Sequence, residues 1–137
     1  MSRGLGDVYK RQISWFQKRK KIVAVEPENC PTLNVALKKG KPSNVSVSGI
    51  AASALGAKVI GDICFGLSKE HQLESLVVSD DEIKKAQKIL WEYHRIFVEP
   101  AGATALAAII FGKYKPKANE KLGILICGAN PNIIPEF

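Results

Sequence analysis

The chain has 137 residues, 46% hydrophobic and 24% charged, which is the composition of an ordinary globular protein and suffices for the core of one domain. No apolar run approaches the roughly 18 residues of a membrane span, and no secretory signal is apparent, so we expect no membrane partner. The net charge of +7 invites a nucleic-acid partner, but the lysines concentrate at the N-terminal end, at expected helix ends and in loops. Charge runs there are usually solvated, so we expect no nucleic-acid partner.

The three cysteines are Cys30, Cys64 and Cys127, an odd number without a Cys-x-x-Cys spacing. This pattern argues against a disulfide framework and against a zinc ribbon, and it favours a reduced, cytoplasmic location. His71 and His94 are not at the spacing of metal ligands, so no histidine–cysteine metal cluster is expected.

The N-terminal region divides into a leader and the start of a domain. Residues 1–12 match no periodic template, and the join near Ile13 is abrupt. We therefore expect residues 1–12 to be a non-native or disordered leader and residues 13–137 to form the domain. The run Lys21–Glu26 is continuous, apolar and rich in β-branched residues, which is typical of a fully buried parallel strand, and Pro27 stops it.

Three helical segments are expected after this strand. The first opens at Pro31 and closes at Gly40, because proline is favoured in a first helical turn and glycine after a last one. A polar loop over residues 41–49 follows. The other two segments are a short turn, Ile50–Leu55, and a helix, Val59–Glu70, with Ile60, Ile63, Cys64 and Leu67 on one face.

The next strand is expected at Leu76–Val78. Ser79–Glu82 then has the pattern of a capping box, in which the serine accepts from the amide of Glu82 and the glutamate reaches back. The helix that follows carries apolar residues at helical spacing, namely Ile83, Ala86, Leu90 and Tyr93.

Pro100 starts an alanine-rich helix that runs to Phe111 and closes at Gly112. This helix is apolar nearly all round, so we expect it to be buried. After a lysine-rich loop, Leu122–Ile126 is predicted to be the last strand. Strands that alternate with helices predict the α/β class, here a three-layer domain with a parallel sheet between helices.

Four short blocks point to a family: Ile22–Pro27, Ala54–Lys58, Val98–Ala103 and Ile126–Asn130. In this order and at this spacing, they resemble the serine/threonine dehydratases, within the tryptophan-synthase-β superfamily of fold-type II pyridoxal-phosphate enzymes. The resemblance covers about residues 13–132. It implies that the chain is a C-terminal fragment, about the last third, of the catalytic domain of such an enzyme, with pyridoxal 5'-phosphate as cofactor.

Cys127 ends the last predicted strand, and the resemblance places its thiol at the pyridine nitrogen of the cofactor. A neutral partner leaves that nitrogen largely unprotonated, which suits β-elimination of water from serine or threonine. The alternative is that Cys127 is only a small buried residue. Gly128 lets the backbone pass close to a flat ring, but Ala129 stands where the family commonly has a second glycine.

Three further residues are expected near the cofactor by the same resemblance. Leu55 and Gly56 would lie against its face, although Gly56 is equally suited to ending a helical turn. Glu99 would lie close to the cofactor, or else it is simply stabilised by the dipole of the helix that starts at Pro100.

A monovalent cation, such as potassium, is also implied. The resemblance carries over the carboxylate of Glu26 and the main-chain carbonyls of Cys30, Leu55 and Ala57 as its ligands. One charge with carbonyl oxygens suits potassium better than magnesium, which needs stricter geometry. The racemase branch has a second carboxylate where this chain has Thr32. The alternative is that Glu26 caps the following loop through backbone amides.

Two parts that such an enzyme needs find no match. The Schiff-base lysine and the glycine-rich phosphate loop have no counterpart: Lys20 and Lys21 sit in a charged run, and Gly4–Gly6 is too sparse. No catalytic residue is therefore assigned. The expected function is that of a fragment of an L-serine/L-threonine ammonia-lyase that is inactive alone and binds the cofactor weakly if at all.

Other functions stay open. The chain is alternatively a non-catalytic small-molecule-binding or interaction module with the same fold, or part of a serine racemase or threonine synthase. The full-length enzyme would take a small amino-acid substrate, and its family commonly forms homodimers. The sequence does not decide between serine and threonine.

Overall fold

Two parallel strands form the sheet of the computed structural model, which describes residues 21–128. Strand β1 (Val23–Pro27) pairs with β2 (Glu74–Val78), with Val23 opposite Glu74 and Pro27 opposite Val78. Parallel pairing requires a crossover, which the helices between the two strands supply. The expected leader, residues 1–12, lies outside the described residues.

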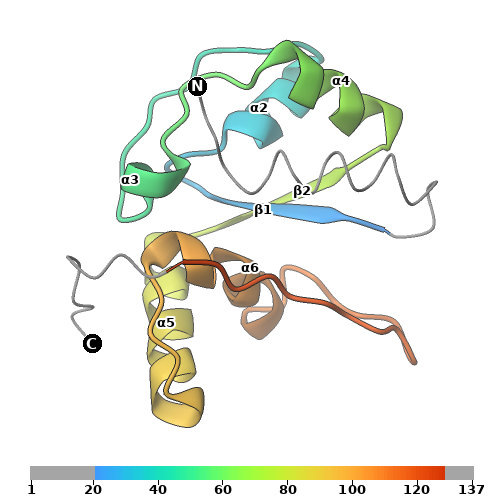
Figure 1. Ribbon diagram of the computed structural model, residues 1–137. Helices are drawn as coiled ribbons and strands as arrows, with labels where there is room; N and C mark the ends of the chain where they lie inside the picture. Colours follow the sequence, from blue (N-terminus) through green and yellow to red (C-terminus); the bar gives the residue numbers. More distant parts are fainter. Residues whose placement is uncertain (1–20, 129–137) are drawn as a thin grey trace.

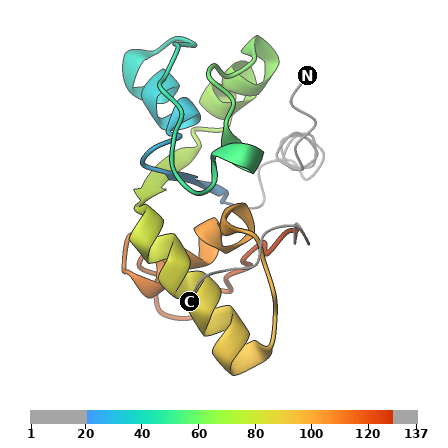
Figure 2. The same cartoon turned by 90° about the vertical axis from the view of Figure 1, so that its left-hand side faces the viewer.

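Five helices accompany these strands within residues 21–128: α2 (Thr32–Lys39), α3 (Ala52–Leu55), α4 (Asp62–Glu70), α5 (Asp80–His94) and α6 (Pro100–Ile110). Helices α2, α3 and α4 lie on one face of the strands, and α5 and α6 lie on the other (Figures 1 and 2). The predicted α/β class and its three layers are confirmed. None of these helices has the length and apolar character to cross a bilayer, as far as residues 21–128 are concerned.

The capping box at the start of α5 is confirmed. The amide of Glu82 donates to Ser79 Oγ at 3.2 Å, and the amide of Ser79 donates to Glu82 Oε2 at 2.8 Å. Each bond satisfies one of the amides that a helix start leaves without an intrahelical partner.

The core lies between α5, α6 and the strands. Its buried members are Val78, Ile83, Ala86, Leu90, Val98, Ala103, Ala107 and Ala108. The alanines of α6 have short side chains, so the backbones of α5 and α6 can approach closely. Burial of α6 is therefore confirmed for most of its length, although Ile110 near its end is exposed.

Two residues that were expected on the apolar face of a helix are exposed instead. Tyr93 is 76% exposed, because the last turns of α5 project beyond the strands and α6 (Figure 1). Ile63 is 80% exposed, because α4 packs with Phe65 and Ser68 inward instead; the helix also starts at Asp62 rather than at the expected Val59.

The prediction of a strand at Leu122–Ile126 is also wrong. The segment is assigned to no helix or strand, and Leu122, Leu125 and Ile126 are exposed. A strand needs a neighbour to complete its ladder. Within residues 21–128, no backbone hydrogen bond joins this segment to another part of the chain.

Candidate cofactor site

The end of the described chain lies against the first turn of α6. The amide of Glu99, the residue that precedes α6, donates to the carbonyl of Gly128 at 3.2 Å. The amide of Gly102 donates to the carbonyl of Glu99 at 2.9 Å, which closes the first turn. These bonds bring the predicted cofactor-binding residues Glu99 and Gly128 together and place Cys127 beside them.

Two glycines permit this approach. A β-carbon on Gly102 would lie well inside contact distance of the carbonyl oxygen of Cys127. Gly128 has a φ of +70°, and a β-carbon there would lie 2.6 Å from Glu99 Oε1. A side chain at position 102 would meet main-chain oxygen and push the two segments apart, whereas at position 128 the close atom is the end of a flexible side chain that can move away. The left-handed φ favours glycine at position 128, and the expected close approach to a flat ring stays a prediction.

Gly102 was not assigned a role from the sequence. Its signal was present, because it is the glycine within the otherwise alanine-rich start of α6, in the block Val98–Ala103. Helical periodicity does not require glycine there. Only the position of Cys127, 25 residues further on, does so.

A cavity of about 630 Å³ lies between β1, α6 and the extended segment 121–127. Leu55 and Cys127 both line it, although 72 positions separate them in the sequence. Its walls are mostly apolar, with Ala101, Thr104 and Ala105 contributed by α6. Two of the residues expected to contact one cofactor therefore face a single space.

Gly56 follows Leu55 at the end of α3, with a φ of −81°, so a left-handed conformation is not what favours glycine there. A β-carbon on Gly56 would meet the carbonyl oxygen of Ala52 and lie 3.2 Å from Val47 Cγ1. Glycine at this position therefore permits a tight turn, and this turn directs Leu55 toward the cavity.

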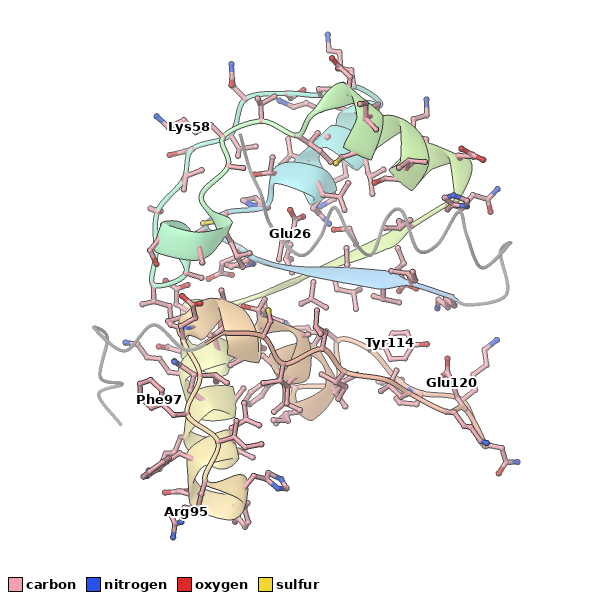
Figure 3. All side chains as sticks on the ribbon, viewed as in Figure 1. Glu26, Lys58, Arg95, Phe97, Tyr114 and Glu120 are labelled. Carbon is pink, nitrogen blue, oxygen red and sulfur yellow. The ribbon has the colours of Figure 1, made fainter. Side chains whose placement is uncertain are left out.

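Glu26 is directed away from the cavity. It lies on β1 and points to the layer that contains α2 (Figure 3). Its carboxylate accepts from the amides of Leu33 and Asn34, each at 2.7 Å, and from Ser75 Oγ at 3.3 Å. A carboxylate at a helix N-terminus is stabilised both by these bonds and by the helix dipole. Glu26 thus accepts from backbone amides, as the alternative interpretation expected, but these amides belong to α2 rather than to a loop.

Two of the other expected cation ligands, Cys30 and Ala57, lie at the start of α2, where the carbonyl of Cys30 accepts from the amide of Thr32 at 3.0 Å. Thr32 Oγ1 donates to the carbonyl of Ala57 at 2.5 Å, and Cys30 Sγ donates to the carbonyl of Ser48 at 3.1 Å. Burial raises the pKa of the Cys30 thiol, and the nearby carboxylates of Asp80 and Glu26 add to that rise, so the thiol stays neutral.

Side chains of His, Cys, Asp and Glu form no group of three that suits a metal ion within residues 21–128. The expected potassium site would not appear as such a group, because it combines the carboxylate of Glu26 with main-chain carbonyls. The potassium site stays a prediction.

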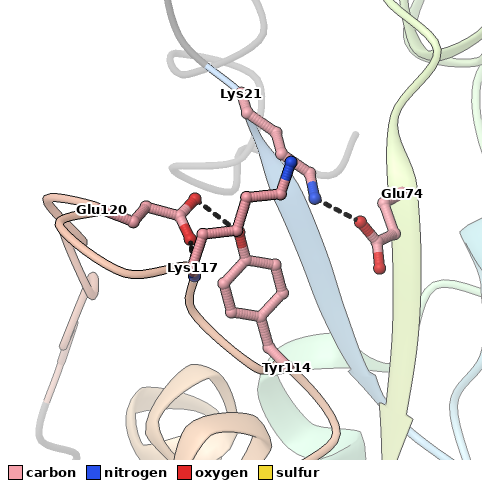
Figure 4. A network of polar contacts seen from close by, with 5 residues as sticks. All are labelled: Lys21, Glu74, Tyr114, Lys117 and Glu120. Atoms are coloured by element: carbon pink, nitrogen blue, oxygen red, sulfur yellow. Dashed lines mark hydrogen bonds and ion pairs between the residues drawn. The ribbon is translucent and has the colours of Figure 1, made fainter.

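Three residues that line the cavity, Lys21, Tyr114 and Glu120, belong to a polar network (Figure 4). Lys21 Nζ lies 2.8 Å from Glu74 Oε2 and 4.9 Å from the centre of the Tyr114 ring. The Tyr114 hydroxyl donates to Glu120 Oε1 at 2.7 Å, and the amide of Lys117 donates to Glu120 Oε2 at 2.9 Å. This network was not foreseen, because it joins Lys21, just before β1, to a loop more than 90 positions away.

The network keeps Lys21 charged. Its hydrogen bond to Glu74 raises the pKa of the Lys21 ammonium. A lysine that reacts as a nucleophile needs a lowered pKa, so this environment is unsuited to a catalytic amine. The same network raises the pKa of Tyr114, chiefly through the hydrogen bond to Glu120.

Comparison with known proteins gives a consistent result. The family model described as "Pyridoxal-phosphate dependent enzyme" matches residues 3–128. A biosynthetic L-threonine dehydratase of Salmonella typhimurium is 37% identical over 115 residues, which are 82% of this chain and 22% of that protein. A serine racemase of Dictyostelium discoideum is 36% identical over 95 residues, which are 69% of this chain and 27% of that protein.

Solved structures agree on the fold. The structure of the serine racemase from Dictyostelium discoideum superposes with a TM-score of 0.78 at 32% identity, over 94% of this chain and 41% of that one. A fungal L-serine ammonia-lyase from Rhizomucor miehei superposes with a TM-score of 0.66 at 21% identity, over 75% of this chain and 32% of that one. The chain thus spans less than half the length of each of these proteins.

Proposed function

Because the chain belongs to the family of pyridoxal-phosphate dependent enzymes, we propose that it is the C-terminal part of an L-serine or L-threonine ammonia-lyase. Such an enzyme eliminates water from its substrate and then releases ammonia and a 2-oxo acid. The observation that carries the proposal is the shared cavity of Leu55 and Cys127, next to the contact between Glu99 and Gly128.

These residues suit the flat ring of the cofactor. Cys127 offers a thiol and Leu55 offers an apolar contact, and the glycines at 102 and 128 let the segment that carries Cys127 lie against α6. The cofactor, when bound, supplies the electron sink that labilises the bonds of the substrate α-carbon. The part of the protein described here would hold and orient that ring rather than carry out proton transfer.

The catalytic lysine and the phosphate loop would come from polypeptide beyond this chain. The relatives above are several times longer than the matched region, which covers 22% and 27% of their length. Lys21 is paired with Glu74 and is not a substitute. We therefore propose that the isolated chain is inactive. The potassium ion at Glu26, the cytoplasmic location and a homodimeric full-length enzyme belong to the same proposal.

A serine racemase is the second candidate, because the protein of Dictyostelium discoideum matches this chain well in sequence and in structure. Position 32 favours the ammonia-lyase. The resemblance implies a second carboxylate there in the racemases, whereas Thr32 in this chain donates its hydroxyl hydrogen to Ala57. A neutral hydroxyl suits a monovalent cation better than a divalent one.

A fusion protein tests the proposal. The part of the Escherichia coli L-threonine dehydratase that precedes its matched region, which is 37% identical to this chain, would be joined before Ile13. With pyridoxal phosphate, we expect the fusion to release 2-oxobutanoate from threonine or pyruvate from serine, and the isolated chain to release neither.

Two variants at one position provide the matched control. Cys127→Ser keeps a small neutral hydrogen-bonding group and should keep most of the activity, whereas Cys127→Ala should lose at least tenfold in kcat. Equal activity of both variants in a folded, cofactor-loaded fusion would contradict the role of Cys127. Racemisation of serine without release of pyruvate would favour the second candidate.

A further inference from the structure

A glutamine lies on the buried face of α5. Gln87 is 5% exposed and stands at helical spacing with Ile83, Ala86 and Leu90, which are all buried in the core. A polar side chain in such a position is costly unless it is hydrogen-bonded. Gln87 meets this condition with its side-chain amide, whose Nε2 donates to the carbonyl of Val98 at 2.9 Å. A polar group of the core is thus directed to one backbone carbonyl, just before α6.

That carbonyl belongs to the peptide group between Val98 and Glu99. The amide of the same peptide group donates to the carbonyl of Gly128 at 3.2 Å. This peptide group is trans, so its carbonyl and its amide point in opposite directions within one plane. Gln87 and Gly128 therefore hold one peptide group from its two sides.

The held peptide group connects the core with the candidate cofactor site. Gly128 directly follows Cys127, which lines the cavity together with Leu55. Among the described residues, no other backbone hydrogen bond reaches residues 121–128 from elsewhere in the chain. A rotation of the peptide group would turn the Glu99 amide away from Gly128 and so release the segment that carries Cys127.

We propose that Gln87 is a positioning residue of the cofactor site. Gln87 does not line the cavity itself. Its hydrogen bond fixes the orientation of the Val98–Glu99 peptide group, and this orientation determines where Gly128 and the neighbouring Cys127 lie. The proposal rests on the proposed function, because the position of Cys127 serves the cofactor ring that this function requires.

Burial makes the bond of Gln87 hard to replace. Gln87 and Val98 are 5% and 4% exposed, so little water can reach the Val98 carbonyl if the glutamine donor is removed. A donor at a carbonyl also polarises the peptide group and strengthens the bond that its amide donates. The bond to Gly128 is at the long end of the usual N–H···O range of about 2.7–3.2 Å, so it should be the first to be lost.

Two variants of Gln87 test the proposal in the fusion with the Escherichia coli segment. Gln87→Met keeps the length of the side chain but has no donor, and Gln87→Glu offers a donor only when its carboxyl is protonated. We expect Gln87→Met to bind pyridoxal phosphate about tenfold more weakly than the parent, measured by titration of the visible absorption of the bound cofactor. Lys84→Met, at an exposed position of α5, is the control and should bind it as the parent does.

The glutamate variant adds a pH-dependent readout. Its carboxylate would face the Val98 carbonyl as acceptor against acceptor, and burial raises the pKa of such a carboxyl. The affinity of Gln87→Glu for the cofactor, compared with the parent at each pH, should therefore approach the parental value as the pH falls. Groups that both proteins share, Glu99 among them, cancel in this comparison. A pH-independent deficit of Gln87→Glu, or parental affinity of Gln87→Met, would overturn the proposal.

Hydrogen–deuterium exchange of the isolated chain gives a measurement that needs no cofactor. The amide of Glu99 should exchange about tenfold faster in Gln87→Met than in the parent, whereas the amides of β2 keep their rates. An unchanged rate at Glu99 would contradict the proposal. Equal acceleration at Glu99 and in β2 would contradict it too, because Gln87 would then only stabilise the fold.

Failure of this inference and failure of the proposed function can be told apart. If the fusion releases 2-oxobutanoate or pyruvate and Gln87→Met has parental cofactor affinity, the positioning role is removed and the ammonia-lyase stays. If the fusion binds the cofactor in a manner that depends on Gln87 and releases neither product, the positioning role stays and the ammonia-lyase is removed.

Discussion

The carbonyl oxygen of Cys127 lies against the α-carbon of Gly102, in the first turn of α6, closer than a β-carbon would allow. This contact fixes the end of the described chain to the helix that covers the cavity. It also aligns Glu99 with Gly128, whose carbonyl accepts from the Glu99 amide. The candidate cofactor site therefore depends on a residue that makes no side-chain contact of its own.

Gly102→Ala should separate α6 from residues 127–128. Overpacking of this kind costs about 1–3 kcal/mol, and we expect a loss of that size in the free energy of urea unfolding. Gly66→Ala is the matched control, because Gly66 is inside α4 and a β-carbon there meets nothing within 4 Å. The control should be neutral or gain up to about 1 kcal/mol. Equal stability of both variants would contradict the close contact.

Ser79→Ala should destabilise α5 by removing one half of its capping box. Loss of an N-cap serine costs about 0.5–2 kcal/mol, measured as the change in the free energy of urea unfolding. Ser53→Ala is the control, since Ser53 is exposed in α3 and should change stability by less than about 0.5 kcal/mol. A loss no larger than that of the control would show that the capping box contributes nothing.

Because of Glu82, the free energy of unfolding should depend on pH in the acid range. Partial burial opposes ionisation, but the hydrogen bond from Ser79 and the ammonium of Lys113 outweigh it and lower the pKa of the Glu82 carboxyl. A lowered folded-state pKa gives stability that is present above the unfolded pKa and lost as the pH falls through the folded one. The stability difference between the parent and Glu82→Gln should therefore shrink between about pH 5 and pH 3.

The control for that experiment is Glu92→Gln, because Glu92 is half-exposed and forms only a long ion pair with Lys88 at 3.7 Å. Its stability difference from the parent should be small at every pH. If the difference for Glu82→Gln stayed constant down to about pH 3, the assigned interactions of Glu82 would be wrong.

Glu26→Gln should weaken the connection between β1 and α2. The carboxylate accepts from two amides of α2, and replacing one oxygen by an NH₂ group sets donor against donor. We expect a loss of about 1–3 kcal/mol in the free energy of unfolding. Glu28→Gln, at an exposed position just after β1, should be close to neutral.

The same pair of variants tests the proposed potassium ion. A cation bound to the folded state stabilises it increasingly as its concentration rises, so KCl should raise the unfolding midpoint of the parent more than equal ionic strength of choline chloride does. Glu28→Gln should keep this response and Glu26→Gln should lose it. An identical response of all three proteins would remove Glu26 from the cation site.

Local features of this chain were predictable from its sequence. The capping box at Ser79 and Glu82, the proline at the start of α6 and the apolar strand before Pro27 all follow from residues within a few positions of one another. Their physics is that of single helical turns and short strands. The family blocks likewise supplied a prediction of the cofactor-binding residues.

Only the tertiary structure decided what joins distant positions. It directs Glu26 to the amides of α2, brings Leu55 to the same cavity as Cys127, and leaves residues 122–126 without a ladder to any other described residue. A sequence pattern records that a segment is apolar enough for a sheet, but not whether a neighbouring strand is present to accept its hydrogen bonds. Pairing and close packing are properties of two segments at once, which is why they became visible only in three dimensions.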